Sequence, residues 1–377
     1  MKETVDIDAT SIESELRELW QGLAEAGDRD NQAVMRACVL NFIIYCGNAG
    51  DAQEMSQILA EITSEHPSRV ILVTPIPGNK DQLQVEVTAR CHSVAGKRDH
   101  ICCEIIHLSA SKKSLDRVAS LIWTLLIPDL PTAVWWRSKP APDSPFLQSL
   151  IDMADRVILD MEELDPYSSV FRQLSRLIER NMEQTAFSDL AWSRLTPWRR
   201  AMAGFSDVPA WKHHLTDVER IEICFQRSIE KASISIRALY LVSWLASRLG
   251  WKRMNRPAKA KSTEIILQKG NAVGQVAVLF KVEESIPSQA GITGVRLITG
   301  GDQPGIFDVL RTDEQRYLQS RVVIDEQEIG SRISHKSQQE ESELVCRELE
   351  ILGHDFVFEE AFRFMANCLL EAPRVSE

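Results

Sequence analysis

Apolar residues recur along the first part of the chain at two spacings, one typical of helices and one typical of buried strands. Residues 11–25 and 51–65 carry apolar side chains every three or four positions, which predicts amphipathic helices. Residues 35–46 and 69–73 contain nearly continuous apolar runs, which predict strands. Because a strand, a helix and a strand follow one another here, the pattern predicts a right-handed βαβ unit with parallel strands.

The same alternation continues to about residue 160. Strands are predicted at residues 85–89, 100–108, 133–136 and 157–159, and helices at residues 115–126 and 146–153. Together these elements predict an N-terminal α/β sandwich with a mixed sheet over residues 1–160.

The second half of the chain begins with helical patterns and continues as strands. Residues 161–188 predict a helix that links two domains, and residues 232–249 predict another strong helix. Strands are predicted at residues 217–225, 264–267, 273–282, 293–299, 306–311 and 317–324, and two terminal helices at residues 338–352 and 355–371. The expected fold class is α/β (α+β), with a C-terminal α+β domain over residues 189–377 that combines helices with a largely antiparallel sheet.

Composition narrows the classes of function. The 377 residues are 44% hydrophobic and 26% charged, which is enough for two domains with real cores. The net charge of −11 argues against general nucleic-acid binding. No apolar run is long enough to span a bilayer, and the first residues lack the apolar stretch of a signal peptide. We therefore expect a cytoplasmic protein with no nucleic-acid and no membrane partner.

The cysteine pattern indicates neither a metal site nor a redox motif. The eight cysteines are Cys38, Cys46, Cys91, Cys102, Cys103, Cys224, Cys346 and Cys368. None forms a Cys-x-x-Cys motif, and no metal-ligand spacing is present. In a reducing compartment they are expected to be mostly buried small hydrophobic residues. Redox control stays open as an alternative, but it needs a pair brought together by the fold.

The segment from Asp189 to Arg200 concentrates two tryptophans and three arginines around Pro197. Proline inside a helix breaks it, so the segment is expected to form two short pieces, with Thr196 as a helix cap and Gly204 as a stop. One interpretation is that the tryptophans cap the core and the arginines are solvated. The other is that the segment binds an anionic partner surface, because arginine beside aromatic residues concentrates binding energy at interfaces.

A second candidate surface is the segment Trp135-Trp136-Arg137 at the exit of a predicted strand. Side chains alternate across a strand, so one tryptophan is expected to point inward and the other outward beside Arg137. The partner-binding candidates are Trp135, Trp136, Arg137, Trp192, Arg194, Trp198, Arg199 and Arg200. No catalytic, cofactor-binding or metal-binding residue is predicted.

Three motifs occur in the order known from one protein family. They are His-Pro-Ser-Arg at residues 66–69, Pro-Asp-Leu-Pro followed by Trp-Trp-Arg at residues 128–137, and Asp-Leu-Ala-Trp-Ser-Arg-Leu-Thr-Pro-Trp-Arg at residues 189–199. Over roughly residues 30 to 300, the chain resembles the glucose-6-phosphate dehydrogenase assembly proteins, the OpcA family. The resemblance implies a non-enzymatic partner that assembles or activates the dehydrogenase opening the oxidative pentose phosphate pathway.

Two alternatives to an assembly protein remain open. The first is a sugar-phosphate-acting enzyme such as a lactonase or an isomerase, although the eight histidines are scattered and lie in no recognisable catalytic motif. A loop at residues 47–50 could hold a phosphate, but it matches neither dinucleotide nor P-loop fingerprints. The second is a cysteine-based redox regulator of the same pathway.

Overall fold

The computed structural model describes residues 8–30, 33–47, 51–78, 80–93, 100–227, 234–253, 263–270, 274–284, 291–312, 314, 316–336, 340–351 and 353–370. The chain divides into two compact units, each assembled from separate segments. The first unit comprises Met1–Asp160, Leu177–Leu190 and Glu340–His354. The second comprises Met161–Arg176, Ala191–Gln339 and Asp355–Glu377.

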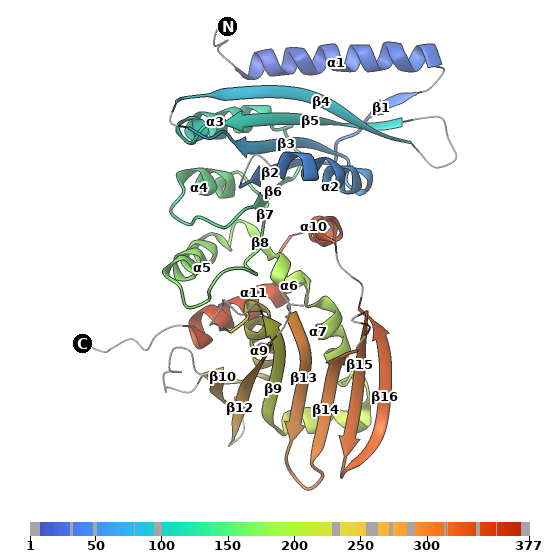
Figure 1. The fold of residues 1–377 in the computed structure, drawn as a ribbon, viewed down its shortest axis with the longest axis vertical. Helices are drawn as coiled ribbons and strands as arrows, with labels where there is room; N and C mark the ends of the chain where they lie inside the picture. Colours follow the sequence, from blue (N-terminus) through green and yellow to red (C-terminus); the bar gives the residue numbers. More distant parts are fainter. Residues whose placement is uncertain are drawn as a thin grey trace, which may run out of the picture. The chain divides into compact units, whose positions relative to one another are not determined.

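The first unit is built on an eight-stranded sheet (Figure 1). Its strands are β1 (Val34–Arg36), β2 (Leu40–Cys46), β3 (Ser68–Pro75), β4 (Leu83–Ser93), β5 (His100–Ala110), β6 (Thr132–Arg137), β7 (Arg156–Leu159) and β8 (Ala186–Asp189). Leaving out short β1 and antiparallel β4, the parallel strands counted in chain order lie in the order 3-2-1-4-5-6. This is the order of a doubly wound sheet, whose connections change direction between β2 and β6.

The predicted βαβ unit is confirmed by β2, helix α2 (Asp51–Glu65) and β3, with β2 and β3 parallel from the pair Leu40–Ser68 onward. The other helices of this unit are α1 (Ala9–Asp30), the 3₁₀ turn η1 (Lys112–Ser114), α3 (Leu115–Leu125), α4 (Pro145–Asp152) and α10 (Glu341–Glu350). Strands β2, β3 and β6 are buried along almost their whole length, as expected for parallel strands covered on both faces.

The helix expected over residues 161–188 is shorter in the structure. Helix α5 covers Ser169–Asn181, and Ala186–Asp189 form strand β8 at the edge of the first sheet. The strand pairs in parallel with β7 through Arg156–Ala186 and its neighbours. Its sequence, Ala-Phe-Ser-Asp, lacks the run of large apolar side chains that marked the equally short strand at residues 157–159, so the pattern could not separate it from the helix before it.

The second unit carries its own eight-stranded sheet (Figure 1). Its strands, in the order β10-β11-β12-β9-β13-β14-β15-β16, are β9 (Val218–Arg227), β10 (Lys252–Arg253), β11 (Glu264–Gln268), β12 (Gln275–Glu284), β13 (Gly291–Thr299), β14 (Gly305–Arg311), β15 (Tyr317–Ile324) and β16 (Gln327–His335). Among the described pairs, only β9 and β12 run parallel. The expectation of a largely antiparallel sheet is therefore confirmed.

Helices line this second unit as well. They are α6 (Leu190–Ser193), α7 (Thr196–Ala203), α8 (Pro209–Lys212), the 3₁₀ turn η2 (His214–Thr216), α9 (Ile236–Leu249), α11 (Phe356–Phe364) and a π-helical turn (Met365–Leu369). Strand β16 was not predicted, because it has no alternation to detect and its Ile329 and Ile333 are 48% and 66% exposed. Across the described residues, none of the helices combines the length and the hydropathy needed to cross a bilayer.

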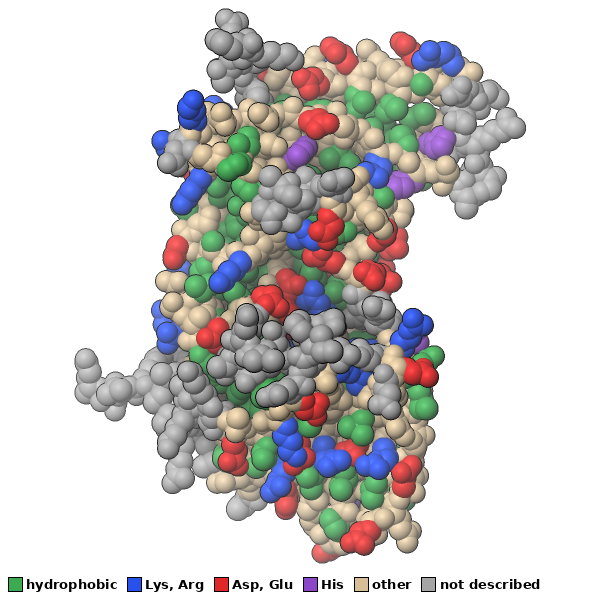
Figure 2. Space-filling model, viewed as in Figure 1, with side chains coloured by type: hydrophobic (Ala, Val, Ile, Leu, Met, Phe, Trp, Pro, Cys, Tyr) green, Lys and Arg blue, Asp and Glu red, His purple; other side chains and the backbone are tan. Residues whose placement is uncertain are grey.

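Charged side chains cross one face of the second sheet from strand to strand. Asp308 is fully buried and accepts hydrogen bonds from Arg296 and Arg321, at 2.7 and 2.8 Å. Glu222 accepts a 2.8 Å bond from Lys281 and lies 3.9 Å from Arg296. Figure 2 shows basic and acidic side chains interspersed over these strands. Opposite charges side by side neutralise one another, so this face presents no large single-sign field.

The structure contains a disulfide, although the sequence pattern predicted no cysteine pair. Cys91 of β4 and Cys102 of β5 lie directly opposite each other, with Cα atoms 4.0 Å apart, and form a disulfide. Their pairing depends on strand register, which no spacing motif reveals. Among the free cysteines, Cys46, Cys103 and Cys346 are buried as predicted, whereas the three others are partly exposed.

We expect reduction of this disulfide to lower the free energy of unfolding by about 2 to 3 kcal/mol, because the bond closes a short loop in the unfolded chain. Urea unfolding with and without reductant measures the change. The Cys91→Ser/Cys102→Ser variant is the control and should unfold identically in both conditions. A wild-type chain whose stability ignores reductant would contradict the expectation.

Candidate functional site

The tryptophan- and arginine-rich segment forms two short helices, α6 and α7, as Pro197 predicted. Pro197 is the second residue of α7, where a missing N–H costs no helical hydrogen bond. Leu195, not Thr196, holds the cap position, and Gly204 ends the helix as expected. The local structure therefore follows from the proline and the glycine that bracket the arginines.

Trp192 is the centre of an aromatic cluster inside the second unit. Its ring lies 5.7 Å from that of Tyr240 and 5.9 Å from that of Phe358, and its Nε1 donates to Asp355 at 3.3 Å. The guanidinium carbon of Arg199 lies 3.7 Å from the centre of the Trp192 ring. This stacking arrangement joins an arginine to an aromatic face inside the protein.

The two tryptophans of this segment are core residues, each 2% exposed. Arg199 is partly buried, and its Nη2 donates to the Thr196 hydroxyl at 3.0 Å. Arg194 is also partly buried, whereas Arg200 is exposed. The interpretation that the tryptophans cap the core therefore describes them correctly, and Arg200 is the residue of the set that is open to a partner.

The expectation that either Trp135 or Trp136 points outward is wrong, because they are 0% and 2% exposed. The alternation itself holds: Trp135 packs in the cluster on the α2 side of the sheet, and Trp136 stacks on Tyr45 with ring centres 4.1 Å apart. Strand β6 lies inside a sheet covered on both faces, so both directions lead into core.

Arg137 ends β6 and joins three elements of the first unit. Its Nη2 lies 3.0 Å from Glu54 of α2, and its Nε donates to Glu341 of α10 at 3.0 Å. Its backbone carbonyl accepts from Gly47 just after β2 at 3.2 Å. The side chain is 16% exposed, so most of its surface is committed to these internal contacts.

The position of Arg137 matters because β2 and β6 flank the point where the sheet changes direction. Doubly wound folds bind dinucleotides there, at the carboxyl ends of the strands, and an acidic residue near the end of the second strand holds the ribose. In this chain the second strand of the βαβ unit, β3, ends in Thr74 and Pro75, and neither residue is acidic. The phosphate-binding loop considered at residues 47–50 falls largely outside the described residues.

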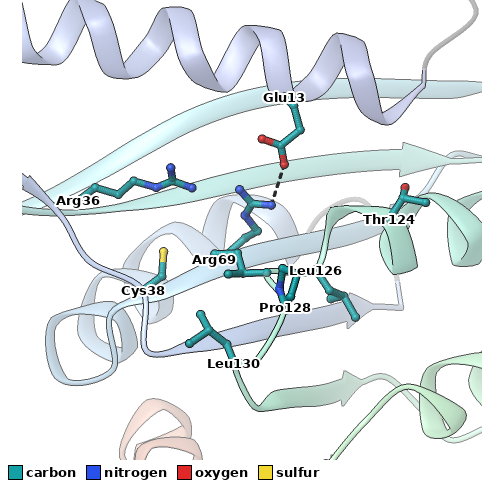
Figure 3. A pocket seen from close by; sticks show the side chains of 9 residues that line it. Glu13, Arg36, Cys38, Arg69, Thr124, Leu126, Pro128 and Leu130 are labelled. Carbon is teal, nitrogen blue, oxygen red and sulfur yellow. Dashed lines mark hydrogen bonds and ion pairs between the residues drawn. The ribbon is translucent and has the colours of Figure 1, made fainter.

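A pocket of about 640 Å³ lies at the opposite edge of the same sheet, by the amino ends of β2, β3 and β6 (Figure 3). Two of the sequence motifs meet in it, since Arg69 ends the His-Pro-Ser-Arg motif and Pro128 and Leu130 belong to the Pro-Asp-Leu-Pro motif. The remaining lining residues are Glu13, Arg36, Cys38, Thr124, Leu126 and Ile127.

An ion network stands behind this pocket. Arg69 is 4% exposed, donates from Nε to the fully buried Glu104, and pairs through Nη1 with Glu13 of α1 at 2.8 Å. Arg36 binds the same Glu104 at 2.9 Å, and Figure 3 shows its side chain directed toward Arg69 above the Cys38 thiol. The two arginines face two glutamates, so the network is formally neutral and ties α1 to the sheet.

Cys38 in this pocket is an unreactive thiol. Burial, and then the charge of Glu104, raise its pKa to about 11, so it carries its proton at neutral pH. The sequence motifs include residues that line this pocket, but the sequence pattern did not indicate that Glu13, Arg36 and Glu104 lie beside them. Only the fold brings α1 and β5 beside them.

The fold defines the class: an α/β protein with a doubly wound sheet in its first unit and a mixed, largely antiparallel sheet in its second. Residues 59–176 match the model of the glucose-6-phosphate dehydrogenase subunit N-terminal domain, and residues 185–362 match the model of its C-terminal domain. The chain belongs to this family, the OpcA glucose-6-phosphate dehydrogenase subunits. The match extends past residue 300, where the motifs stopped.

Curated relatives carry the name OxPP cycle protein OpcA. The Nostoc punctiforme relative is 25% identical over 82% of this chain and 67% of its own length. The Synechocystis relative is 30% identical over 52% of this chain and 40% of its own length. The chain thus spans only two fifths to two thirds of these relatives. Among solved structures, glucose-6-phosphate 1-dehydrogenase from Mycobacterium avium has a TM-score of 0.50 at 12% identity, covering 86% of this chain and 90% of that one. That likeness concerns the fold alone.

Proposed function

We propose that this chain is a non-enzymatic assembly factor and allosteric activator, which binds glucose-6-phosphate dehydrogenase and favours its active oligomer in the oxidative pentose phosphate pathway. The family match over both halves of the chain supports this proposal. The proposed setting is the cytoplasm, with the dehydrogenase as partner and neither nucleic acid nor membrane.

The proposal that the chain is not an enzyme rests on the contacts of Arg137. At the edge where related folds hold a dinucleotide, this arginine is bound by Glu54 and Glu341. The guanidinium that could bind a phosphate of a dinucleotide is therefore engaged by two carboxylates of the chain itself. At the carboxyl ends of its strands, where related folds bind a dinucleotide, this sheet instead holds α10 through Arg137 and Glu341. We therefore infer that the sheet serves as a scaffold.

Activation requires differential affinity. A partner shifts the assembly of an enzyme only if it binds one state better than the others. Coupling free energies of about 1 to 3 kcal/mol are usual and correspond to about 5- to 150-fold changes in affinity. We therefore expect the effect to be largest when the dehydrogenase works below saturation with glucose 6-phosphate.

Arg200 is the best candidate for contact with the dehydrogenase, since it is the exposed residue of the tryptophan- and arginine-rich segment. We expect Arg200→Ala to weaken the complex by about 1 to 2 kcal/mol and to leave the melting temperature unchanged. Titration calorimetry and thermal unfolding of the same preparations measure the two effects.

The matched control is Arg199→Ala. Arg199 stacks on Trp192, so its loss should lower the melting temperature. If Arg200→Ala binds like the wild type, the dehydrogenase contacts another surface and this assignment is wrong.

The test of the proposed function is a binding experiment with the host's own dehydrogenase. On a sizing column, a mixture should elute earlier than either protein alone. The purified chain by itself should not turn over glucose 6-phosphate, 6-phosphogluconolactone or other sugar phosphates. Turnover by the chain alone would favour the sugar-phosphate-acting enzyme, and a complex controlled by reduction of Cys91–Cys102 would favour the redox regulator.

A further inference from the structure

Three potential metal ligands meet in the first unit, at the carboxyl end of α2. Glu65 is the last residue of α2, His66 follows it, and Cys346 projects from α10. One ligand atom from each lies within 4.8 Å of the other two. Their burial increases in the order Glu65, His66, Cys346, so the cluster opens to solvent at one side.

The ring of His66 has a buried nitrogen atom that could bind a ligand. Its Nε2 is buried and has no hydrogen-bond partner among the residues that the structure describes. A buried ring nitrogen without a partner loses its interaction with water and gains nothing in return. Donation of the lone pair of this nitrogen to a metal ion would remove that cost, and neutral imidazole is the commonest protein ligand for such ions.

The surroundings of Cys346 are negative. The thiol is buried and donates a hydrogen bond to Glu65, and Glu350 and Glu61 lie close enough to act on it. Carboxylates gathered around a buried thiol attract a divalent cation, and bound metal deprotonates a coordinating thiol outright.

The frame that holds the three ligands is rigid. Met55 and Leu59 of α2 pack in one buried cluster with Leu344 and Val345 of α10. The Ser342 hydroxyl donates to Glu61, which adds a polar link between the same two helices. A site placed on packed helices keeps its ligands near the geometry that a metal requires.

We propose that Glu65, His66 and Cys346 form a binding site for a divalent transition metal of the Zn²⁺ class. Imidazole nitrogen, thiolate sulfur and carboxylate oxygen are all ligands that zinc accepts, whereas Mg²⁺ and Ca²⁺ select oxygen ligands. Three protein ligands leave the fourth tetrahedral position to water.

Binding proceeds by exchange of a proton for the metal. The thiol of Cys346 releases its proton to solvent, its sulfur lone pair forms the bond to Zn²⁺, and no oxidant or reductant takes part. The Glu65 carboxylate that accepts the thiol hydrogen bond then faces the metal. The result is a link between the end of α2 and α10, through His66 and Cys346, which lie about 280 residues apart in the chain. Metal would stabilise the first unit because it binds only the folded arrangement.

Cobalt is the probe for this site. Co²⁺ is added to the full, metal-free chain without reductant, so that the Cys91–Cys102 disulfide stays closed. We expect one cobalt per chain, a thiolate-to-cobalt absorption band with the visible bands of tetrahedral cobalt, and loss of these bands on addition of Zn²⁺. Zn²⁺ should also raise the melting temperature of the wild type.

Variants decide whether these residues are the ligands. Cys346→Ser should lose the thiolate band, and His66→Gln should lose one-to-one binding, whereas Cys224→Ser of the second unit should behave like the wild type. Glu65→Gln changes an exposed residue without threatening the fold, and should weaken cobalt binding by at least about tenfold. A wild type without the band, or a band that survives in Cys346→Ser, would overturn the proposal. If Cys346→Ser does not fold, unchanged cobalt affinity in Glu65→Gln would overturn it equally.

Discussion

Arg69→Met is expected to lower the free energy of unfolding by about 3 kcal/mol, because it leaves the buried Glu104 with only Arg36 and the Trp20 indole as partners. Glu104 is 0% exposed, and Arg69 binds it from within the sheet. Urea unfolding measures the loss. A double-mutant cycle with Glu104→Met should return part of it, since removing both charges leaves no uncompensated carboxylate in the core.

The control for this substitution is Arg117→Met. Arg117 and Asp81 are 50% and 61% exposed and 3.8 Å apart, and such surface pairs contribute at most about 1 kcal/mol. Equal effects of Arg69→Met and Arg117→Met would mean that the ion network behind the pocket does not stabilise the first unit.

Trp135→Ala is expected to destabilise the chain by about 3 to 5 kcal/mol, because it empties a large volume from the core beneath α2. Trp135 is 0% exposed and lies in the same buried cluster as Phe42 and Ile158. Thermal or urea unfolding measures the change. Binding to the dehydrogenase should fail only under conditions in which the variant has also unfolded.

Trp123→Ala provides the matched control on the surface of α3. Trp123 is 62% exposed, so its replacement should change stability by no more than about 0.5 kcal/mol. A Trp135→Ala variant that keeps wild-type stability but loses the complex would restore the interpretation of Trp135 as an interface residue.

The elements with strong periodicity could be predicted from the sequence. Helix α2 and the strands β11 to β15 match the predicted segments to within a few residues, because their apolar faces carry a clear period. Strands β8 and β16 could not be predicted, since β8 lacks a run of large apolar side chains and β16 is exposed on both faces. The sequence pattern also could not show that Glu340–His354 join the first unit, because only contacts reveal this.

The candidate sites, too, could be predicted from the sequence only in part. Pro197 and Gly204 fix the local form of their segment, and the sequence predicts both effects. Burial depends on what covers each face, so the alternation of Trp135 and Trp136 could not tell a solvent-exposed face from a second core. Pairs such as Cys91–Cys102 and His66–Cys346 depend on register and on packing between distant segments, which spacing motifs do not encode.

Whether this chain activates the dehydrogenase, as proposed, is decided by one titration. The host's glucose-6-phosphate dehydrogenase is assayed at a glucose 6-phosphate concentration well below saturation while the purified chain is added in increasing amounts. We predict a rate that rises about 5-fold or more and saturates at the concentration at which the complex forms on a sizing column. An unchanged rate over the whole titration, with no complex on the column, would contradict the proposed function.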